Sequence, residues 1–495
     1  MNIAQNLERS ARYFPENIAV IDDHVQLTYK ELDRWSSRIA AGLMSQDVGR
    51  GDFVAICQKN AAQWPAIYYG ILKCGAVAVT LSAQLSHDEF RILVEHSEPK
   101  LLFTDEKRLA QIPPCHDGKK VPRIVASGTE LDLIALESSG GEPVSSIVCK
   151  RDDTACILYT GGTTGLPKGV MLTHENINTA IQNVVQMERS TESDRSLCFL
   201  PFNHVFGQMH ILNATILSGG GLVLLPEFDL DRVFSAINDH DVTKLYAVPT
   251  LYIRFLQVQG LKKKLGRVRY CFSAAASMAS EVVNQWKKVT SLKIYEAYGM
   301  TETASMVTFN HYHDHVVGSV GVPAGNTEVA IVDPSGIRLG LGEEGEICIR
   351  GRNVMKGYLN NSEATNEAIT DGWLRSGDVG YLDEQEYLYI VDRIKDMIIT
   401  GGENVYPKEV EEVLYKKSEV MECAVIGLPD AEYGERVTAY VVLKPGASLD
   451  SVELKRYCKS CLSPFKVPKE FIALPGLPTT NSGKILKREL RKKMM

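Results

Sequence analysis

The stretch LTYKELDRWSSRIAAGLMSQDVGRGDFVAIC, residues 27–57, decides the fold class. Thr28 and Glu31 form a T-x-x-E capping box, which predicts the start of a helix. The apolar residues that follow recur at helical spacing; they are Leu32, Trp35, Ile39 and Leu43. Gly49 and Gly51 are expected to end this helix, and the apolar run FVAIC then predicts a buried strand. A helix followed by a buried strand is the repeating unit of an α/β protein.

The same unit recurs further along the chain. A second helix is expected over 64–74, and the apolar run AVAVTL (76–81) predicts the strand after it. Helices and short apolar strands continue to alternate over 155–250. We therefore predict an α/β fold, with a large N-terminal domain of α/β layers and largely parallel sheets.

The character of the sequence changes twice in its C-terminal third. From about residue 318, short strands separated by Gly, Asn and Asp turns predict a small β-rich subdomain. After Asp392 a unit of mixed helices and strands begins, of a common domain size. The predicted organisation is an N-terminal domain over 1–391, a junction at 392–396 and a small α+β domain over 397–495.

Composition restricts the partners and the location. The formal net charge of −7 gives no electrostatic case for nucleic acid. No uninterrupted apolar run approaches the length of a membrane span, and the N-terminus lacks a signal-peptide core. The eleven cysteines show no disulfide framework. We expect reduced thiols in a cytoplasmic protein.

A glycine-rich loop with a lysine, YTGGTTGLPKGV (159–170), is the first candidate for binding phosphate. Glycines let backbone N–H groups approach an anion, and threonine hydroxyls and a lysine add donors. The loop does not match the P-loop template, because Pro167 precedes the lysine and Gly169 follows it. A plain turn between two strands is the alternative. The candidate residues are Thr160, Gly161, Gly162, Thr163, Thr164, Gly165 and Lys168.

Further polar stretches follow this loop in order. They are FNHVFGQ (202–208), YGMTE (298–302), LRSGD (374–378), DRIKDMIITGGEN (392–404) and NSGKILKREL (481–490). Together with the loop they resemble the motifs of the adenylate-forming acyl-CoA synthetase superfamily. The resemblance covers essentially the whole chain, and the motifs stand in the same order.

The resemblance implies a ligase that uses ATP, Mg²⁺ and CoA to convert a carboxylic acid into a thioester. The carboxylate would attack the α-phosphorus of ATP to give acyl-AMP and pyrophosphate, and a thiol would then displace AMP. Negative charge builds on the α-phosphate in the first step, so cations and donors are needed there. The glycine-rich loop would hold the β- and γ-phosphates.

The family motifs also imply a role for each matching residue in adenylation. Lys484 would reach the carboxylate and the α-phosphate, Glu302 would hold Mg²⁺, and Thr301 would hydrogen-bond the α-phosphate. As structural alternatives, Lys484 is one more lysine of a basic tail, and Glu302 is a carboxylate at a helix start.

The nucleoside site is implied in the same way. Asp378 would accept both ribose hydroxyls, Arg393 would reinforce that contact, and Tyr298 would stack on adenine. From the residues alone, Asp378 could equally be an ordinary turn aspartate.

For the second half-reaction, the resemblance implies that the small domain rotates about Lys395. Rotation would withdraw Lys484 and bring in Gly401 and Gly402, which would let the pantetheine arm of CoA pass close to the backbone. His204 would line the route between the acyl pocket and the thiol. A strand-to-helix turn is the structural alternative for the two glycines.

The predicted acyl pocket is formed by small or apolar side chains, which suit an uncharged tail. Its candidates are Val205, Phe206, Val248, Ala274, Ala275, Met300 and Met306. Two departures from the family pattern stand out, because Gly161 replaces a frequent serine and FSAAASM (272–278) lacks the usual Gly-Ala-x-Pro-Leu. Fatty-acyl and 4-coumarate-type aryl ligases therefore both remain open.

Several other interpretations also remain. Residues 202–206 hold no carboxylate for an amino group, which argues against an α-amino acid substrate. No carrier domain follows residue 495, so CoA is the expected acceptor, with an amine or a carrier protein as alternatives. A P-loop NTPase would form ADP instead of AMP, and a non-catalytic nucleotide-binding protein would be expected to lack Lys484 or Glu302. The assembly is open, with a homodimer as one alternative.

The histidines of HYHDH (311–315) are spaced like metal ligands on a strand. No cysteine or carboxylate constellation in the sequence supports them. We therefore assign no metal site there.

Overall fold

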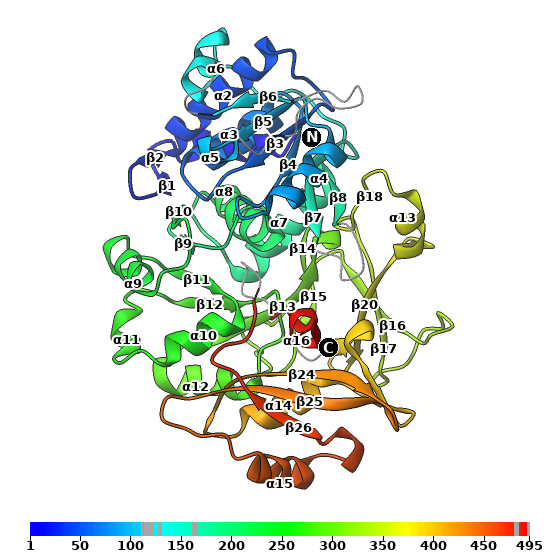
Figure 1. The fold of residues 1–495 in the computed structure, drawn as a ribbon. Coiled ribbons are helices and arrows are strands. Elements are labelled where there is room, and N and C mark those ends of the chain that lie inside the picture. The colour runs from blue at the N-terminus through cyan, green and yellow to red at the C-terminus, as the bar shows by residue number, and fades with distance from the viewer. Residues whose placement is uncertain (110–111, 113–121, 127–130, 161–166, 480–484, 493–495) are drawn as a thin grey trace.

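The computed structural model describes residues 1–492 apart from 110–111, 113–121, 127–130, 161–166 and 480–484. Two large sheets lie one above the other, with the β-rich subdomain at their side and the C-terminal domain below (Figure 1). The α/β fold predicted from the sequence is confirmed.

The first sheet has the strand order β18-β8-β7-β4-β3-β5-β6. These strands are β18 (Gly357–Tyr358), β8 (Lys168–Thr173), β7 (Thr154–Thr160), β4 (Val77–Thr80), β3 (Phe53–Cys57), β5 (Leu101–Thr104) and β6 (Arg123–Val125). Helices packed around it include α2 (Tyr29–Ser45), α3 (Gln63–Lys73), α4 (His87–Ser97), α5 (Glu106–Leu109) and α6 (Leu133–Ser139). Strands β3, β4, β5, β6 and β7 pair in parallel, whereas β7 and β8 form an antiparallel hairpin.

The opening stretch of the sequence folds largely as predicted. The hydroxyl of Thr28 accepts a hydrogen bond from the Glu31 backbone N–H at 3.2 Å, and the Glu31 carboxylate accepts one from the Thr28 N–H at 2.8 Å. FVAIC is the buried strand β3. The predicted C-terminus of the helix was wrong, because α2 ends at Ser45 and not at the glycines. The positive φ of 66° at Asp47 turns the chain there.

The second sheet has the order β15-β14-β13-β12-β11-β9-β10-β1-β2. Its strands are β15 (Val322–Pro323), β14 (Ser305–Phe309), β13 (Ile294–Met300), β12 (Tyr270–Ser273), β11 (Lys244–Ala247), β9 (Arg195–Cys198), β10 (Gly221–Leu224), β1 (Ile18–Ile21) and β2 (Gln26–Thr28). The chain segments between its strands contain α7 (His174–Glu188), α8 (Ala214–Ser218), α9 (Leu230–Asp239), α10 (Pro249–Leu256), α11 (Leu261–Lys264) and α12 (Ser280–Thr290). The N-terminal helix α1 (Ala4–Tyr13) contacts α2, α3 and α8. A π-helix, η1 (Phe206–Asn213), precedes α8 and is buried throughout.

The β-rich subdomain predicted from about residue 318 is an antiparallel sheet. Its order is β16-β17-β20-β19, with β21 paired to β20. The strands are β16 (Glu328–Val332), β17 (Gly345–Arg350), β20 (Trp373–Leu382), β19 (Ile369–Thr370) and β21 (Leu388–Arg393), and α13 (Ser362–Ala368) lies between β18 and β19 in the chain. A short 3₁₀ helix, η3 (Ile394–Asp396), follows β21 and leads into the C-terminal segment.

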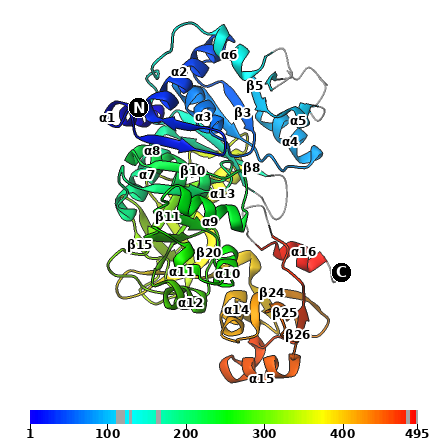
Figure 2. The same cartoon turned by 90° about the vertical axis from the view of Figure 1, so that its left-hand side faces the viewer.

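The C-terminal segment has its own sheet and its own apolar core. The sheet order is β23-β22-β25-β24 with β26 beside β25, and Figure 2 shows it below the second large sheet. Its elements are β22 (Ile398–Thr400), β23 (Glu403–Val405), α14 (Pro407–Tyr415), β24 (Val420–Asp430), β25 (Gly434–Leu443), α15 (Ser451–Cys461), η4 (Pro464–Lys466), β26 (Glu470–Ala473) and α16 (Lys487–Lys492). One cluster of buried apolar residues runs from Ile3 to Leu388, and separate clusters lie within 398–490.

The ten cysteines in the described part of the chain are free thiols. Nine of them are buried, and Cys461 on α15 is exposed. The C-x-x-C pair of Cys458 and Cys461 is thus divided between the interior and the surface of one helix.

Candidate active site

Three residues predicted to bind the nucleoside converge from three strands. Tyr298 lies on β13, Asp378 on β20 and Arg393 at the end of β21. The Tyr298 hydroxyl donates to Asp378 Oδ2 at 2.7 Å, and Arg393 Nε lies 3.1 Å from Asp378 Oδ1. Asp378 and Arg393 are direct partners in the β20–β21 register. Both carboxylate oxygens are therefore held in place on β20.

The predicted magnesium ligand lies close to this group in the chain. Glu302 belongs to η2 (Thr301–Thr303), is buried, and accepts a hydrogen bond from the Tyr358 hydroxyl at 2.9 Å. The pKa of Glu302 is raised overall by burial, and the hydrogen bond from the Tyr358 hydroxyl opposes that rise. Thr301 is half-buried at the start of the same turn.

Tyr358 is a functional candidate that the sequence did not single out. It lies 56 residues from Glu302 and belongs to β18, which pairs with β8. Lys168 starts β8, and its ammonium group lies 4.8 Å from the centroid of the Tyr358 ring. A cation over an aromatic face is a favourable contact. The pairing of β18 with β8 thus places Lys168 near Glu302, which no local pattern in the GYLN segment would indicate.

Some predicted phosphate ligands lie outside the described residues. They are Gly161, Gly162, Thr163, Thr164, Gly165 and the C-terminal Lys484. Thr160 and Lys168, which flank the loop, are direct partners in the β7–β8 hairpin. Thr479 and Ile485, on either side of residues 480–484, form an isolated antiparallel bridge.

The predicted acyl-pocket residues come from several elements around the second sheet. Val205 and Phe206 begin the π-helix, Val248 precedes α10, and Ala274 follows β12. The others are Ala275, with a positive φ of 73°, Met300 at the end of β13, and Met306 on β14. Five of the seven are buried, and Ala275 and Met300 are half-buried.

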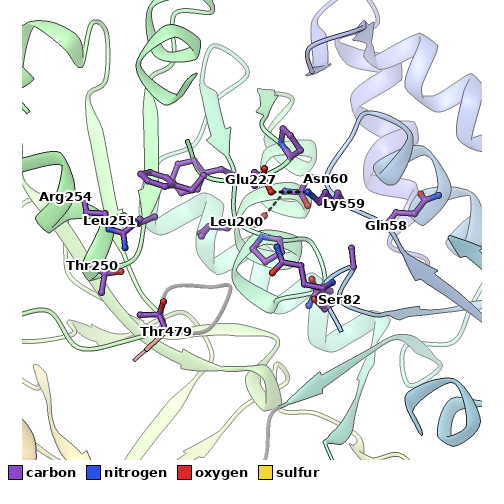
Figure 3. A pocket seen from close by; sticks show the side chains of 17 residues that line it. Gln58, Lys59, Asn60, Ser82, Leu200, Glu227, Thr250, Leu251, Arg254 and Thr479 are labelled. Atoms are coloured by element: carbon purple, nitrogen blue, oxygen red, sulfur yellow. Dashed lines mark hydrogen bonds and ion pairs between the residues drawn. The ribbon is translucent and has the colours of Figure 1, made fainter. Parts of the chain in front are cut away.

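Asn203, the residue before His204, lines a cavity of about 270 Å³ that Figure 3 shows from close by. The ring Nδ1 of His204 accepts a hydrogen bond from the Phe206 N–H at 3.2 Å, which orients the ring at the start of the π-helix. Residues from five other parts of the chain also line this cavity. Among these are Asn60 after β3, Thr250, Leu251 and Arg254 on α10, and Thr479 of the C-terminal segment.

The predicted hinge lies in η3, between the two sets of apolar clusters. Burial and the neighbouring Arg393 lower the pKa of Lys395. Gly401 and Gly402, in the turn between β22 and β23, have φ values of 61° and 85°. Residues other than glycine adopt this left-handed region at a cost, so the turn itself requires glycine here.

In the 311–315 stretch, the ring Nδ1 of His311 accepts a hydrogen bond from the His313 N–H at 3.2 Å. His313 Nε2 lies 2.7 Å from an Arg189 guanidinium nitrogen, and His315 Nε2 lies 2.7 Å from the carbonyl oxygen of Ile294. Over the described residues, no group of three or more His, Cys, Asp or Glu side chains is arranged to hold a metal ion.

Comparison with known proteins defines the class. The family model described as AMP-binding enzyme matches residues 7–359, and that of the AMP-binding enzyme C-terminal domain matches residues 409–484. A long-chain-fatty-acid–CoA ligase of Bacillus subtilis (strain 168) is 34% identical over 98% of this chain and 93% of its own length.

Solved structures agree over the whole chain. ATP-bound MatB from Rhodopseudomonas palustris matches with a TM-score of 0.92 and 33% identity, covering 100% of this chain and 99% of that one. The anthranilate CoA ligase AuaEII in complex with anthranoyl-AMP matches with a TM-score of 0.94 and 26% identity, covering 100% and 97%.

The fold and these relatives therefore define an AMP-forming acid–thiol ligase. The chain belongs to the AMP-binding enzyme family. Within the described residues, no helix is both long enough and apolar enough to span a membrane.

Proposed function

We propose that this protein activates a carboxylic acid with an apolar body as its acyl-AMP and transfers the acyl group to CoA. The observation that carries the assignment of roles is the convergence of Tyr298 and Arg393 on the buried carboxylate of Asp378. A carboxylate fixed by two donors suits a pair of ribose hydroxyls. Tyr298 is assigned to the adenine and Arg393 to support of Asp378.

In the first half-reaction a carboxylate oxygen of the acid attacks the α-phosphorus, and the bond to the β-phosphate oxygen breaks as pyrophosphate leaves. Charge develops on the α-phosphate oxygens. We assign Thr301 and Lys484 to these oxygens. Thr160, Lys168 and the glycine-rich loop between them are assigned to the departing phosphates. Lys168 supports this assignment, because it lies near the Glu302 side of the site.

A magnesium ion fits the residues present. Mg²⁺ usually takes one or two carboxylates together with substrate phosphate oxygens, so a three-residue cage is not needed. Glu302 offers a buried hard oxygen ligand, and Tyr358 fixes its orientation. When bound, the ion would neutralise phosphate charge next to Thr301.

In the second half-reaction the thiol sulfur attacks the acyl carbonyl carbon, and the bond to the AMP oxygen breaks. The cavity lined by Asn203 opens between α10, the segment after β3 and the C-terminal segment (Figure 3). We assign this cavity to the entry of the thiol. Arg254 in its lining provides a cationic group suited to a phosphorylated carrier such as CoA, whereas the ammonium group of Lys59 is paired with the Glu227 carboxylate at 3.0 Å.

We further propose that residues 1–391 and 397–495 move relative to each other about 392–396, with Lys395 as the pivot. The buried members of the apolar clusters lie on one side of this segment or the other, which supports separate bodies, and the half-buried Tyr415 and Met421 of the C-terminal segment pack against the N-terminal cluster. The rotation would exchange Lys484 for Gly401 and Gly402. A cytoplasmic location and a homodimer are further proposals that rest on the sequence alone.

The assignment of Lys484 can be tested by separating the half-reactions. Lys484→Ala should nearly abolish acyl-AMP formation from ATP and acid, yet leave the reaction of CoA with supplied acyl-AMP much less affected. Lys492→Ala, in the same basic tail, serves as the matched control and should leave both steps unchanged. Equal loss of both steps in Lys484→Ala would contradict the assigned role.

A further inference from the structure

A fully buried group of charged side chains lies directly behind the predicted acyl pocket. Glu188, the last residue of α7, has no exposed surface. Its Oε1 lies 2.7 Å from His210 Nε2. Its Oε2 accepts hydrogen bonds from the Tyr246 hydroxyl at 2.6 Å and from the Lys244 ammonium group at 2.9 Å. The adenylation and thiol-transfer steps use none of these residues.

His210 connects this group with the pocket wall. It lies on the π-helix four residues after Phe206, and the two ring centroids are 5.3 Å apart. The Phe272 ring lies closer still, at 4.4 Å. The other ring nitrogen, Nδ1, is 3.4 Å from the hydroxyl of Ser305, which directly precedes the pocket residue Met306. Two polar groups, His210 and Ser305, thus meet in the interior beside Phe206 and Met306, which are residues of the predicted acyl pocket.

The charge on Glu188 determines which ring nitrogen of His210 faces Ser305. Burial alone would raise the pKa of Glu188, but Lys244 and His210 lower it to about 2, so Glu188 is a carboxylate at neutral pH. The Nε2–H of His210 donates to this carboxylate, and the Nδ1 edge faces Ser305. The Ser305 contact is at the long end of hydrogen-bonding distance, so both groups keep capacity for another partner.

Such an arrangement is a poor way to stabilise a core. Buried ion pairs are often no more stabilising than apolar side chains of the same volume, which makes this group weak evidence for stability alone. Single π-helical turns are frequent at functional sites. The residues on either side of the pair, Phe206 and Met306, are both candidates for contact with the acyl group.

We propose that His210 and Ser305 form a hydrogen-bonding end wall of the acyl pocket, which selects acids that carry an oxygen function at the end far from the reacting carboxylate. Glu188 is a positioning residue that acts through His210. This inference rests on the proposed ligase activity and on the assignment of Phe206 and Met306 to the acyl pocket. It names the substrate class as an apolar body with a polar far end.

Matched pairs of acids test the proposal. We would measure kcat/KM for acid-dependent AMP release with benzoate, cinnamate and hexanoate, and with the same acids bearing a terminal hydroxyl or a terminal carboxylate. At least one oxygen-bearing member should be preferred by about tenfold, the size of one well-placed hydrogen bond. Preference for the hydroxyl or for the carboxylate identifies which oxygen function the wall accepts.

Variants of Ser305, His210 and Glu188 then test whether these residues cause the preference for oxygen-bearing acids. Ser305→Ala and His210→Phe should bring the ratio of kcat/KM within a pair close to one, mainly through KM of the oxygen-bearing acid. Glu188→Gln should also lower this ratio of kcat/KM, because a neutral amide accepts a weaker hydrogen bond from the Nε2–H of His210. Ser36→Ala removes a buried hydroxyl from α2, far from the pocket, and should leave the ratio unchanged.

The outcomes separate this inference from the activity on which it rests. AMP release without any preference for an oxygen-bearing acid would overturn the end wall and leave the ligase intact. A preference that survives in both Ser305→Ala and His210→Phe would overturn it as well. If His210→Phe does not fold, Ser305→Ala, which leaves Glu188 fully paired, decides the result. Absence of AMP with every acid would contradict the ligase activity itself.

Discussion

The guanidinium of Arg393 and the carboxylate of Asp378 face each other across paired strands, with Nε and Oδ1 3.1 Å apart. Arg393 is also the residue directly before η3, through which the chain enters the C-terminal segment. The contact therefore joins the proposed ribose site to the proposed hinge. We expect nucleotide binding and the orientation of the C-terminal segment to be coupled through this pair.

Replacement of Asp378 tests the ribose site. Asp378→Asn keeps the shape but removes the charge that Arg393 contacts, so KM for ATP should rise by about tenfold or more. KM for the acid should change little. Steady-state kinetics with ATP as the varied substrate measures the effect. Asp371→Asn, an exposed turn residue of the same subdomain, is the control. An unchanged KM for ATP would remove Asp378 from the nucleotide site.

The hydrogen bond between Tyr358 and Glu302 predicts a pH dependence. Burial raises the pKa of Glu302, and the Tyr358 hydroxyl opposes that rise. Only the carboxylate form can hold Mg²⁺. Tyr358→Phe therefore should raise the pKa of Glu302 further and move the acid limb of kcat/KM for MgATP to higher pH. Tyr13→Phe, exposed on α1, should leave the limb in place. A limb that stays fixed in Tyr358→Phe would argue against Glu302 as the metal ligand.

Glu296 predicts how stability depends on pH. Burial raises the pKa of this side chain to about 8, with Lys408 opposing the rise and Glu412 adding to it, both from α14. The folded protein thus keeps a proton that the unfolded chain loses near its ordinary pKa. Stability contributed by this group is present at acidic pH and is lost as the pH rises toward 8.

Glu296→Gln removes this dependence. Its melting temperature should exceed that of the wild type at pH 8 by on the order of 1–3 °C, and the gain should shrink at pH 5. Thermal unfolding at the two pH values measures it. Glu384→Gln, an exposed position in the β20–β21 turn, should show no such difference. A gain that is equal at both pH values would contradict a raised pKa at Glu296.

The glycine turn at 401–402 predicts a defect confined to the second half-reaction. Gly402→Leu places a bulky side chain on the proposed thiol path and should block transfer to CoA while sparing acyl-AMP formation. Because φ is 85° there, any side chain also strains the backbone. Gly402→Ala shares that strain without the bulk and should retain most CoA-dependent turnover. Similar losses in both variants would point to strain, and normal turnover in Gly402→Leu would exclude the path.

Local sequence signals predicted the parts of the fold that local forces determine. The capping box of Thr28 and Glu31 and the strand FVAIC appear as predicted, because capping and apolar periodicity act within a few residues. The end of α2 was misplaced, since Asp47 adopted the left-handed conformation that glycines usually take.

The candidate site was predictable only in part. The family motifs indicated that Tyr298, Asp378 and Arg393 act together, but not that Asp378 is held on both oxygens. The contact of Tyr358 with Glu302 depends on the pairing of β18 with β8, which no spacing in the sequence reveals. The Glu188–His210 pair depends on the packing of α7 against the π-helix, and charged residues on a helix usually indicate a solvated face.

The most direct test of the ligase assignment is the identity and the ratio of its products. The protein would be incubated with ATP, Mg²⁺ and CoA across acids of different length, both aliphatic and aryl, and all products would be quantified. The account predicts AMP, pyrophosphate and acyl-CoA in equal amounts, with no release in the absence of acid. Formation of ADP and phosphate, or AMP release that does not depend on an acid, would contradict it.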